Sequence, residues 1–280
     1  MSTVQAADVL RTQPGVIRRL GRVAALIALP LYAALALAYL FAPIAIIILF
    51  SFNDVQGRFN FVWQGFTLDH WLDPLKIPAL ADAMILSLKV AAVSTLIATA
   101  LGTLIALALI RYRFVGASAT NWLVLLPLTT PEVVMGSSLL TLFLSQGIPL
   151  GFNTIVFAHV MFNISYVVVT VKARLGGFDW ALEEAAMDLG ANEWRTFRKV
   201  TLPLIFPGIL AAALLAFALS VDDFIITLFS SGQEVTFPLW VWGAARTAVP
   251  PQINVMGTLI LVTTVTLIGA SVLLQRRRAI

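Results

Sequence analysis

The sequence predicts an all-α integral membrane protein with six transmembrane helices, and three observations carry that prediction. The chain is 60% hydrophobic, only 11% of its residues are charged and its mean hydropathy is +0.94, whereas about a quarter of the residues in a soluble domain are charged. Long stretches lack charge altogether, and a membrane-spanning helix needs about 20 apolar residues. Basic residues gather in alternate loops, the pattern that orients multi-pass membrane proteins.

Charge-poor stretches divide the chain. We expect a tail, a first transmembrane helix, an external segment and a core of five helices, at residues 1–22, 23–52, 53–80 and 81–275. The apolar run after residue 133 is too long for one helix and has a polar break at residues 145–153, so two spans are expected around that break. Within the core, the expected spans lie near residues 82–110, 119–144, 152–171, 204–229 and 252–274.

The distribution of Lys and Arg predicts the orientation. Fourteen of them lie in the two termini and in the second-to-third and fourth-to-fifth loops, whereas the opposite loops hold three. Because positive loops stay on the cytoplasmic side, both termini and the loop at residues 172–203 are predicted to be cytoplasmic. The first apolar run is too long for a cleaved signal peptide and is expected to remain as a membrane anchor.

Acidic residues at membrane depth are candidates for a solute pathway, because burying a charge there is costly. Glu132 follows two prolines that should interrupt the third span; the alternative is a shallow or hydrogen-bonded position. Asp222 and Asp223 are expected within the fifth helix, about 100° apart, so one could line a cavity while the other makes a structural contact. An acidic lining would favour a cationic solute; the alternative is a pair that reaches the lipid headgroups.

Aromatic residues are dense in two segments expected outside the membrane. Those of residues 53–80 are typical of an interfacial belt, with contact to an external partner as the alternative. In the loop at 230–251, Trp240 is a further candidate for the pathway, because the loop is expected to dip into its outer mouth. On the fourth span, His159 and Asn163 are expected to make interhelical hydrogen bonds rather than to bind a ligand.

Several kinds of chemistry lack support in the sequence. The chain has no cysteine and two histidines, so neither thiolate chemistry nor a metal site is predicted, and no catalytic residue is proposed. No GxxxxGK[ST] loop is present to bind ATP phosphates, and HExxH and GxSxG are absent. The net charge of +4 does not indicate nucleic-acid binding, because the basic residues flank the membrane spans.

A polar stretch, residues 183–203, interrupts the apolar sequence. Leu182, Ala185, Ala186 and Leu189 share one face of a predicted helix, and Gly190 is suited to the turn that ends it. Asn192 can then cap a second short helix before Pro203 opens the fifth span. A helix face lined by small residues lets a partner approach closely; the alternative is an ordinary amphipathic surface helix.

The spacing in this stretch resembles the EAA signature of permease subunits of binding-protein-dependent ABC importers. The matching residues are Glu184, Ala185, Ala186, Gly190, Leu202 and Pro203. Val200 stands where the pattern has Ile. Elsewhere IRYRF, PEVVMGSSLL, SVDDFIIT and PQINVMGTLI look like spermidine/putrescine-type permeases, and more like the second of the two permease subunits.

The resemblance implies a type I ABC importer transmembrane fold in a bacterial plasma (inner) membrane. The expected partners are a second permease subunit, two cytoplasmic ATPase subunits that bind ATP and Mg²⁺, and an external solute-binding protein. This chain would bind no cofactor and would not be an enzyme. It would form half of the pathway for a polyamine, or for another small solute such as an aminophosphonate or ferric iron.

The ATPase would bind the loop at residues 172–203 as a coupling helix. The residues expected to serve this coupling are Glu184, Ala185, Ala186, Asp188, Leu189, Gly190, Leu202 and Pro203. Glu184 and Asp188 are expected to orient the helix through ion pairs. Two other classes of protein remain as alternatives: an ATP-independent channel, which would not need a docking helix, and a membrane enzyme using Glu132 or Asp222 as acid or base, which lacks a nucleophile or metal set.

Overall fold

The computed structural model describes the backbone of residues 14–278 and the side chains of residues 28–266 and 269–270. Over that range the protein is helical, and its only β pairing consists of two isolated bridges, which confirms the all-α prediction. The elements are α2 (Pro14–Phe50), α3 (Asp69–Leu72), α4 (Pro78–Arg111), α5 (Ala117–Thr129), α6 (Glu132–Ser145), α7 (Phe152–Leu175), α8 (Ala181–Asp188), α9 (Glu193–Thr196), the π-helix η1 (Phe197–Thr201), α10 (Leu202–Asp222), α11 (Ile225–Ser230), α12 (Phe237–Ala244) and α13 (Pro251–Arg278).

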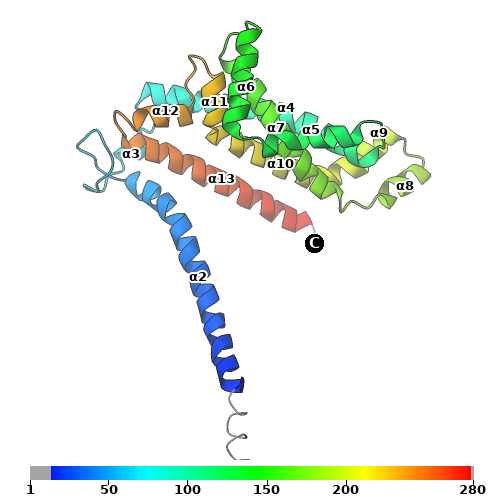
Figure 1. Cartoon of the computed structure of the whole chain (residues 1–280), viewed down its shortest axis with the longest axis horizontal. Helices are drawn as coiled ribbons and strands as arrows, with labels where there is room; N and C mark the ends of the chain where they lie inside the picture. The colour runs from blue at the N-terminus through cyan, green and yellow to red at the C-terminus, as the bar shows by residue number, and fades with distance from the viewer. Residues whose placement is uncertain (1–13, 279–280) are drawn as a thin grey trace, which may run out of the picture.

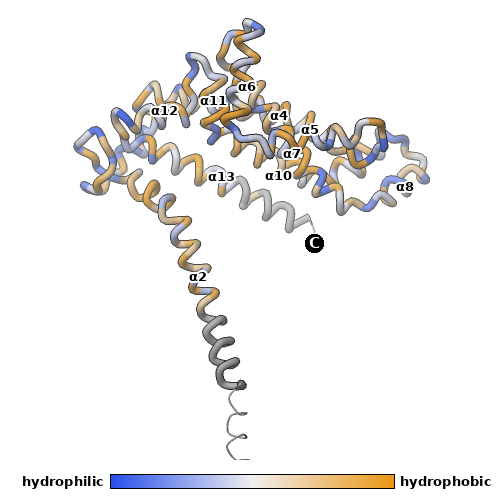
Figure 2. Tube along the Cα trace, in the orientation of Figure 1, coloured by the Kyte–Doolittle hydropathy of each residue, from blue (hydrophilic) through white to orange (hydrophobic). Residues whose placement is uncertain are grey.

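Long apolar helices account for most of the predicted spans (Figure 2). Within the described residues, four helices are long and apolar enough to cross a membrane: Ala28–Phe50, Pro78–Arg111, Phe152–Leu175 and Glu193–Asp222. α5 and α6 together form a fifth candidate, and α13 is apolar over Pro251–Thr266. The count of six spans therefore stays a prediction. Residues 14–22, expected in the tail, already belong to α2, and residues 1–13 lie outside the described part.

The third span is broken into two helices in the region where the sequence predicted an interruption. α5 and α6 are bent by 108° relative to each other at a short break. Thr130 in that break is extended, with ψ of 131°, as expected for a residue before a proline. Pro131 also lacks the N–H group that would continue the helical hydrogen bonds. The expected interruption is thus confirmed at Pro131, where the chain turns sharply, but not at Pro127, which lies inside α5.

The fifth span also differs from its prediction at both ends. α9, η1 and α10 follow one another without a gap, so the second helix of the polar stretch is the start of the span itself. At the other end α10 stops at Asp222, because Asp223 is extended with ψ of 124°. α11 then starts at Ile225 as a separate short helix. The two aspartates therefore flank a helix end and are not consecutive residues of one helix.

α4, α7 and α10 form the main core, and small residues let them approach closely. A Cβ atom on Gly102 of α4 would lie 2.6 Å from Cγ1 of Val167 on α7. Ala98 of α4 and Ala212 and Ala216 of α10 are fully buried in the same cluster. By contrast α2 points away from this body (Figure 1), and none of its apolar segment is buried.

The segment between α2 and α4 is held by two buried asparagines. The Nδ2 group of Asn53 donates to Oδ1 of Asn60 and to the carbonyl of Val62, each at 2.7 Å. The backbone of Asn60 donates to the carbonyl of Val249 at 3.0 Å, which joins this segment to the residues just before α13. Aromatic side chains remain exposed on it, among them Phe61 and Phe66. Whether they meet lipid or a partner stays a prediction.

Candidate functional site

Two regions hold the predicted functional residues, at opposite ends of α10. The first contains α8, whose helix and turn follow the sequence prediction. Gly190 has φ of +85°, a conformation that costs residues with a Cβ about 1–2 kcal/mol. Oδ1 of Asn192 accepts a hydrogen bond from the backbone N–H of Arg195 at 2.8 Å, so it caps α9 as predicted.

α8 presents its apolar side chains to the surroundings. Leu189 is 90% exposed, Leu182 is 44% exposed and Ala185 is exposed as well. Apolar residues that face outward together mark an interaction surface more often than scattered single ones do. We call Leu182, Ala185 and Leu189 the outer face of α8. Leu202 and Pro203 do not belong to it, because they form the first turn of α10.

The acidic residues of α8 differ in burial. Glu183 is 4% exposed, and its Oε2 atom lies 3.0 Å from Nη2 of Arg111. Glu184 and Asp188 are exposed. Within the described residues the ion pair of this helix therefore belongs to Glu183, not to Glu184 or Asp188. The sequence contained one signal for the burial of Glu183. This residue stands two positions before Ala185, so its side chain points to the opposite side of the helix from the exposed Ala185.

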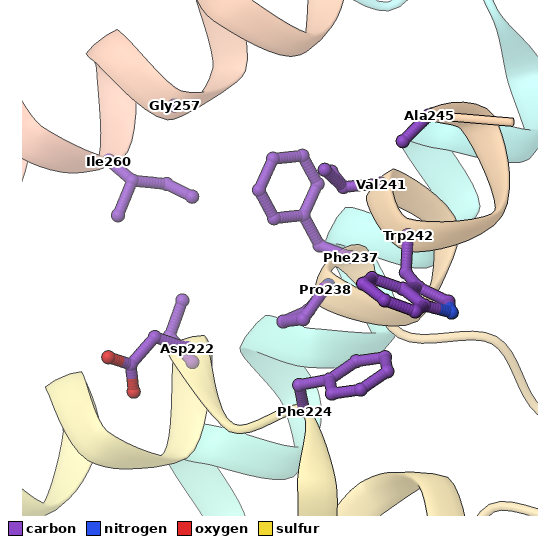
Figure 3. A pocket seen from close by; sticks show the side chains of 10 residues that line it. Asp222, Phe224, Phe237, Pro238, Val241, Trp242, Ala245, Gly257 and Ile260 are labelled. Carbon is purple, nitrogen blue, oxygen red and sulfur yellow. The ribbon is translucent and has the colours of Figure 1, made fainter. Parts of the chain in front are cut away.

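The second region is a cavity of about 450 Å³ at the opposite end of α10 (Figure 3). Asp222 is the one charged side chain among its described lining residues. The wall comes from α10, the break after it, α12 and α13, through Val221, Phe224, Phe237, Pro238, Val241, Trp242, Ala245, Gly257 and Ile260. An exposed carboxylate on an otherwise apolar, aromatic surface can bind a cation that also carries hydrocarbon.

Asp223 turns away from that cavity into a buried hydrogen-bonded network. Its Oδ2 atom accepts from the hydroxyl of Thr227 at 2.7 Å and from the backbone N–H of the same residue at 2.8 Å, and lies 3.3 Å from Nε2 of His159. Nδ1 of His159 lies 2.6 Å from Oγ of Ser220, which in turn lies 3.1 Å from Oγ of Ser94. One aspartate thus lines a cavity and the other makes structural contacts, which is the division that the sequence allowed.

Glu132 adds a second acidic group near Asp222. It is the first residue of α6, where the helix dipole favours a carboxylate, and it is exposed. It is close enough to Asp222 for the two carboxylates to repel each other electrostatically.

The structure places Trp242, rather than Trp240, in the wall of this cavity. Trp240, the predicted pathway residue, packs against Leu80, Met84 and Met256. Trp242 lines the cavity, with its ring centroid 5.3 Å from that of Phe224 and 5.2 Å from Cζ of Arg246. Residues two positions apart point about 200° apart around a helix, so only one of Trp240 and Trp242 can face the cavity. The sequence alone could not place the axis of α12.

His159 and Asn163 were both expected to form hydrogen bonds between helices, and the structure bears this out for only one of them. His159 of α7 bonds to residues of α10 and α11, as predicted. Asn163 is fully buried, yet neither its Nδ2 nor its Oδ1 atom has a partner within the described residues. The expected hydrogen bond of Asn163 is therefore not made within this part of the chain.

Known proteins with the same sequence pattern and fold identify the family. The family model of binding-protein-dependent transport system inner membrane components matches residues 98–279. The chain is 40% identical to the spermidine/putrescine transport system permease protein PotC of Escherichia coli K12, over 85% of this chain and 90% of that protein. It is 37% identical to the putrescine transport system permease protein PotI of the same strain, over 81% and 83%.

Solved structures share the fold at lower identity. A bacterial alginate ABC transporter, in complex with an alginate pentasaccharide-bound periplasmic protein, matches with a TM-score of 0.66 and 17% identity, over 93% of this chain and 96% of that one. An amino acid ABC transporter matches with a TM-score of 0.57 and 20% identity, over 76% and 100%. The chain therefore belongs to the family of binding-protein-dependent transport system inner membrane components and has the type I ABC importer permease fold.

Proposed function

We propose that this protein is one of two permease subunits of an ATP-driven importer and forms half of the translocation pathway for a polyamine. The observation that carries the proposal is Asp222, a single exposed carboxylate in an apolar and aromatic cavity. The two E. coli relatives are named for spermidine and putrescine transport. The lining of the cavity suits a solute of that kind.

A polyamine carries ammonium groups separated by methylene chains, and the cavity offers a contact for each. The Asp222 carboxylate would attract one ammonium group, and Glu132 lies within electrostatic reach for another. Trp242 and Phe224 present aromatic surface, which binds cations favourably. The remaining wall would contact the methylene groups. Asp223 would contribute indirectly, because its bonds fix the backbone that places Asp222.

The outer face of α8 would bind a partner ATPase. ATP and Mg²⁺ would be bound by that ATPase, and this chain would have no catalytic role. Binding of ATP would draw two such ATPase subunits together, and α8 would move with the subunit it contacts. Because packed interfaces shift as units, this movement would change the access of the Asp222 cavity from one side of the membrane to the other.

The orientation follows from the basic loops. α8 and both termini would be cytoplasmic, whereas the segment with Asn53 and Asn60 and helix α12 would face outward in a bacterial inner membrane. An external solute-binding protein would release its solute there. A second permease subunit would complete the pathway opposite the Asp222 cavity.

Transport by the reconstituted complex tests the proposal. The two permeases, the ATPase and the binding protein would be placed in liposomes, and uptake of radiolabelled spermidine would be followed with and without ATP inside. We expect uptake to require both ATP and the binding protein, and unlabelled putrescine to compete. Uptake without ATP would indicate a channel. Competition by an aminophosphonate or ferric iron, but not by putrescine, would contradict the assignment of a polyamine.

A further inference from the structure

We propose that Glu183 is a positioning residue that joins α8 to both α4 and α10, so that a displacement of α8 is passed to these two helices together. The inference rests on the proposed function, in which α8 receives that displacement from an ATPase. It assigns a role to a residue outside the EAA signature, since Glu183 stands immediately before Glu184.

Glu183 is the one buried residue of α8. Leu182, Ala185 and Leu189 face outward, and Ala186 is only half-buried, so the apolar residues contribute little to attaching α8 to the rest of the protein. α8 is connected along the chain through the turn before Ala181 and the turn at Gly190. A buried side chain that makes polar contacts in two directions is therefore its principal attachment through space.

The two carboxylate oxygens of Glu183 bind different elements. Oε2 pairs with Nη2 of Arg111, the last residue of α4, at 3.0 Å. Oε1 accepts from the hydroxyl of Thr201, the last residue of η1, at 2.5 Å. Thr201 is fully buried and directly precedes α10. One side chain thus connects α8 to the cytoplasmic ends of two helices of the core.

Separating Glu183 from Arg111 and Thr201 is electrostatically unfavourable. A buried carboxylate that loses its partner keeps the cost of its desolvation, so α8 cannot shift alone without that penalty. Charge-assisted hydrogen bonds are also stronger and shorter than neutral ones. When α8 moves, Arg111 and Thr201 are expected to move with it.

The contact of Glu183 with Thr201 links α8 to α10, the helix that ends at the proposed solute site. α10 runs from Leu202, next to Thr201, to Asp222 in the cavity. α4 and α10 pack against each other through a buried cluster. The geometry therefore provides a continuous path of packed elements from α8 to the carboxylate that is proposed to contact the solute.

The experiment compares Glu183→Gln and Arg111→Gln with Arg113→Gln in the complete reconstituted complex. Arg113 is exposed, two residues from Arg111, and serves as the matched control. The readout is spermidine taken up per ATP hydrolysed. We expect this ratio to fall about tenfold for Glu183→Gln and Arg111→Gln, since residues of a coupling network change it by that order, and to stay unchanged for Arg113→Gln. The double variant should be no worse than either single one, because the two residues act as one pair.

A distance measurement gives a second readout that does not depend on transport. The chain has no cysteine, so spin labels can be attached at Met187→Cys on α8 and at Val115→Cys in the loop after α4, both exposed sites. We expect one narrow distance distribution in the complex and a broader one with Glu183→Gln. An unchanged ratio together with an unchanged distribution would overturn the proposal. Equal loss of assembly, ATP hydrolysis and uptake would also overturn it, since that pattern indicates a purely structural role.

Ala185→Asp separates this inference from the proposed function. It places a charge on the outer face of α8 without touching Glu183. If Ala185→Asp transports normally, α8 is not the coupling helix and the proposed function fails. If Ala185→Asp loses uptake while Glu183→Gln keeps the wild-type ratio, coupling through α8 stands and only the role of Glu183 is refuted.

Discussion

The two ends of α10 distribute charge and apolar surface in opposite ways. At the end that holds Asp222, this carboxylate is exposed among apolar and aromatic side chains that form a cavity. At the end next to α8, Glu183 is buried in an ion pair, whereas Leu182, Ala185 and Leu189 face outward. We therefore expect the Asp222 end to receive a cation and the α8 end to receive the apolar surface of another protein.

The two ends also share a feature, since each contains a carboxylate fixed by several bonds. Asp223 is held by Thr227 and His159, and Glu183 by Arg111 and Thr201. Each fixed carboxylate has a neighbour in the sequence, Asp222 or Glu184, that is exposed. The difference within each pair suggests that one carboxylate sets the geometry and the other is available for contact.

The largest expected effect comes from placing a charge on the outer face of α8. Ala185→Asp puts a charge where the proposed ATPase contact would bury it, and an unpaired buried charge costs several kcal/mol. We expect uptake by the reconstituted complex to fall at least about 100-fold, as a loss of roughly 3 kcal/mol implies. The amount of this permease in the membrane should not change, because Ala185 is exposed in the chain itself.

Ala185→Ser is the control for that variant, since it is small and uncharged. Copurification with the ATPase subunit gives an independent measurement, and Ala185→Asp should reduce it. Normal copurification and normal uptake together would show that the outer face of α8 does not form the interface.

The sequence could predict those features of the two ends of α10 that depend on neighbouring residues, but not those that depend on contacts with distant residues. The turn at Gly190 and the cap at Asn192 follow from local chemistry, and the structure has both. The burial of Glu183 depends on Arg111, 72 positions earlier in the chain, which no local pattern reveals. The end of α10 at Asp222 was missed for a similar reason, since Asp223 leaves the helix to bond with His159 of α7.

An intermediate effect should distinguish Asp222 from Asp223. Asp222→Asn removes the cavity's charge without removing a described hydrogen bond, so we expect spermidine uptake to fall about tenfold, or roughly 1.4 kcal/mol in transition-state stabilisation. Its thermal unfolding in detergent should match that of the wild type. Asp223→Asn is expected to lower the unfolding temperature instead, because a buried acceptor loses its charge beside His159 and Thr227.

The contrast between these two variants decides the assignment. The measurements are initial uptake rates at several spermidine concentrations and the melting temperature of each purified complex. If Asp222→Asn melted early and Asp223→Asn did not, the division between contact and structure would be reversed. If neither changed uptake, the cavity would not be part of the pathway.

The smallest expected effect concerns the two tryptophans of α12. Trp242 faces the cavity beside Phe224, and an aromatic contact to an exposed cation contributes about 0.5–1 kcal/mol. Trp242→Ala should therefore raise the spermidine concentration for half-maximal uptake by about two- to fivefold, and Trp242→Phe should restore most of the loss. Trp240 packs against Leu80 and Met84, so Trp240→Ala should lower the melting temperature and leave that concentration unchanged. The opposite result would place Trp240, as the sequence first suggested, on the pathway and would move the site from the Asp222 cavity to the other side of α12.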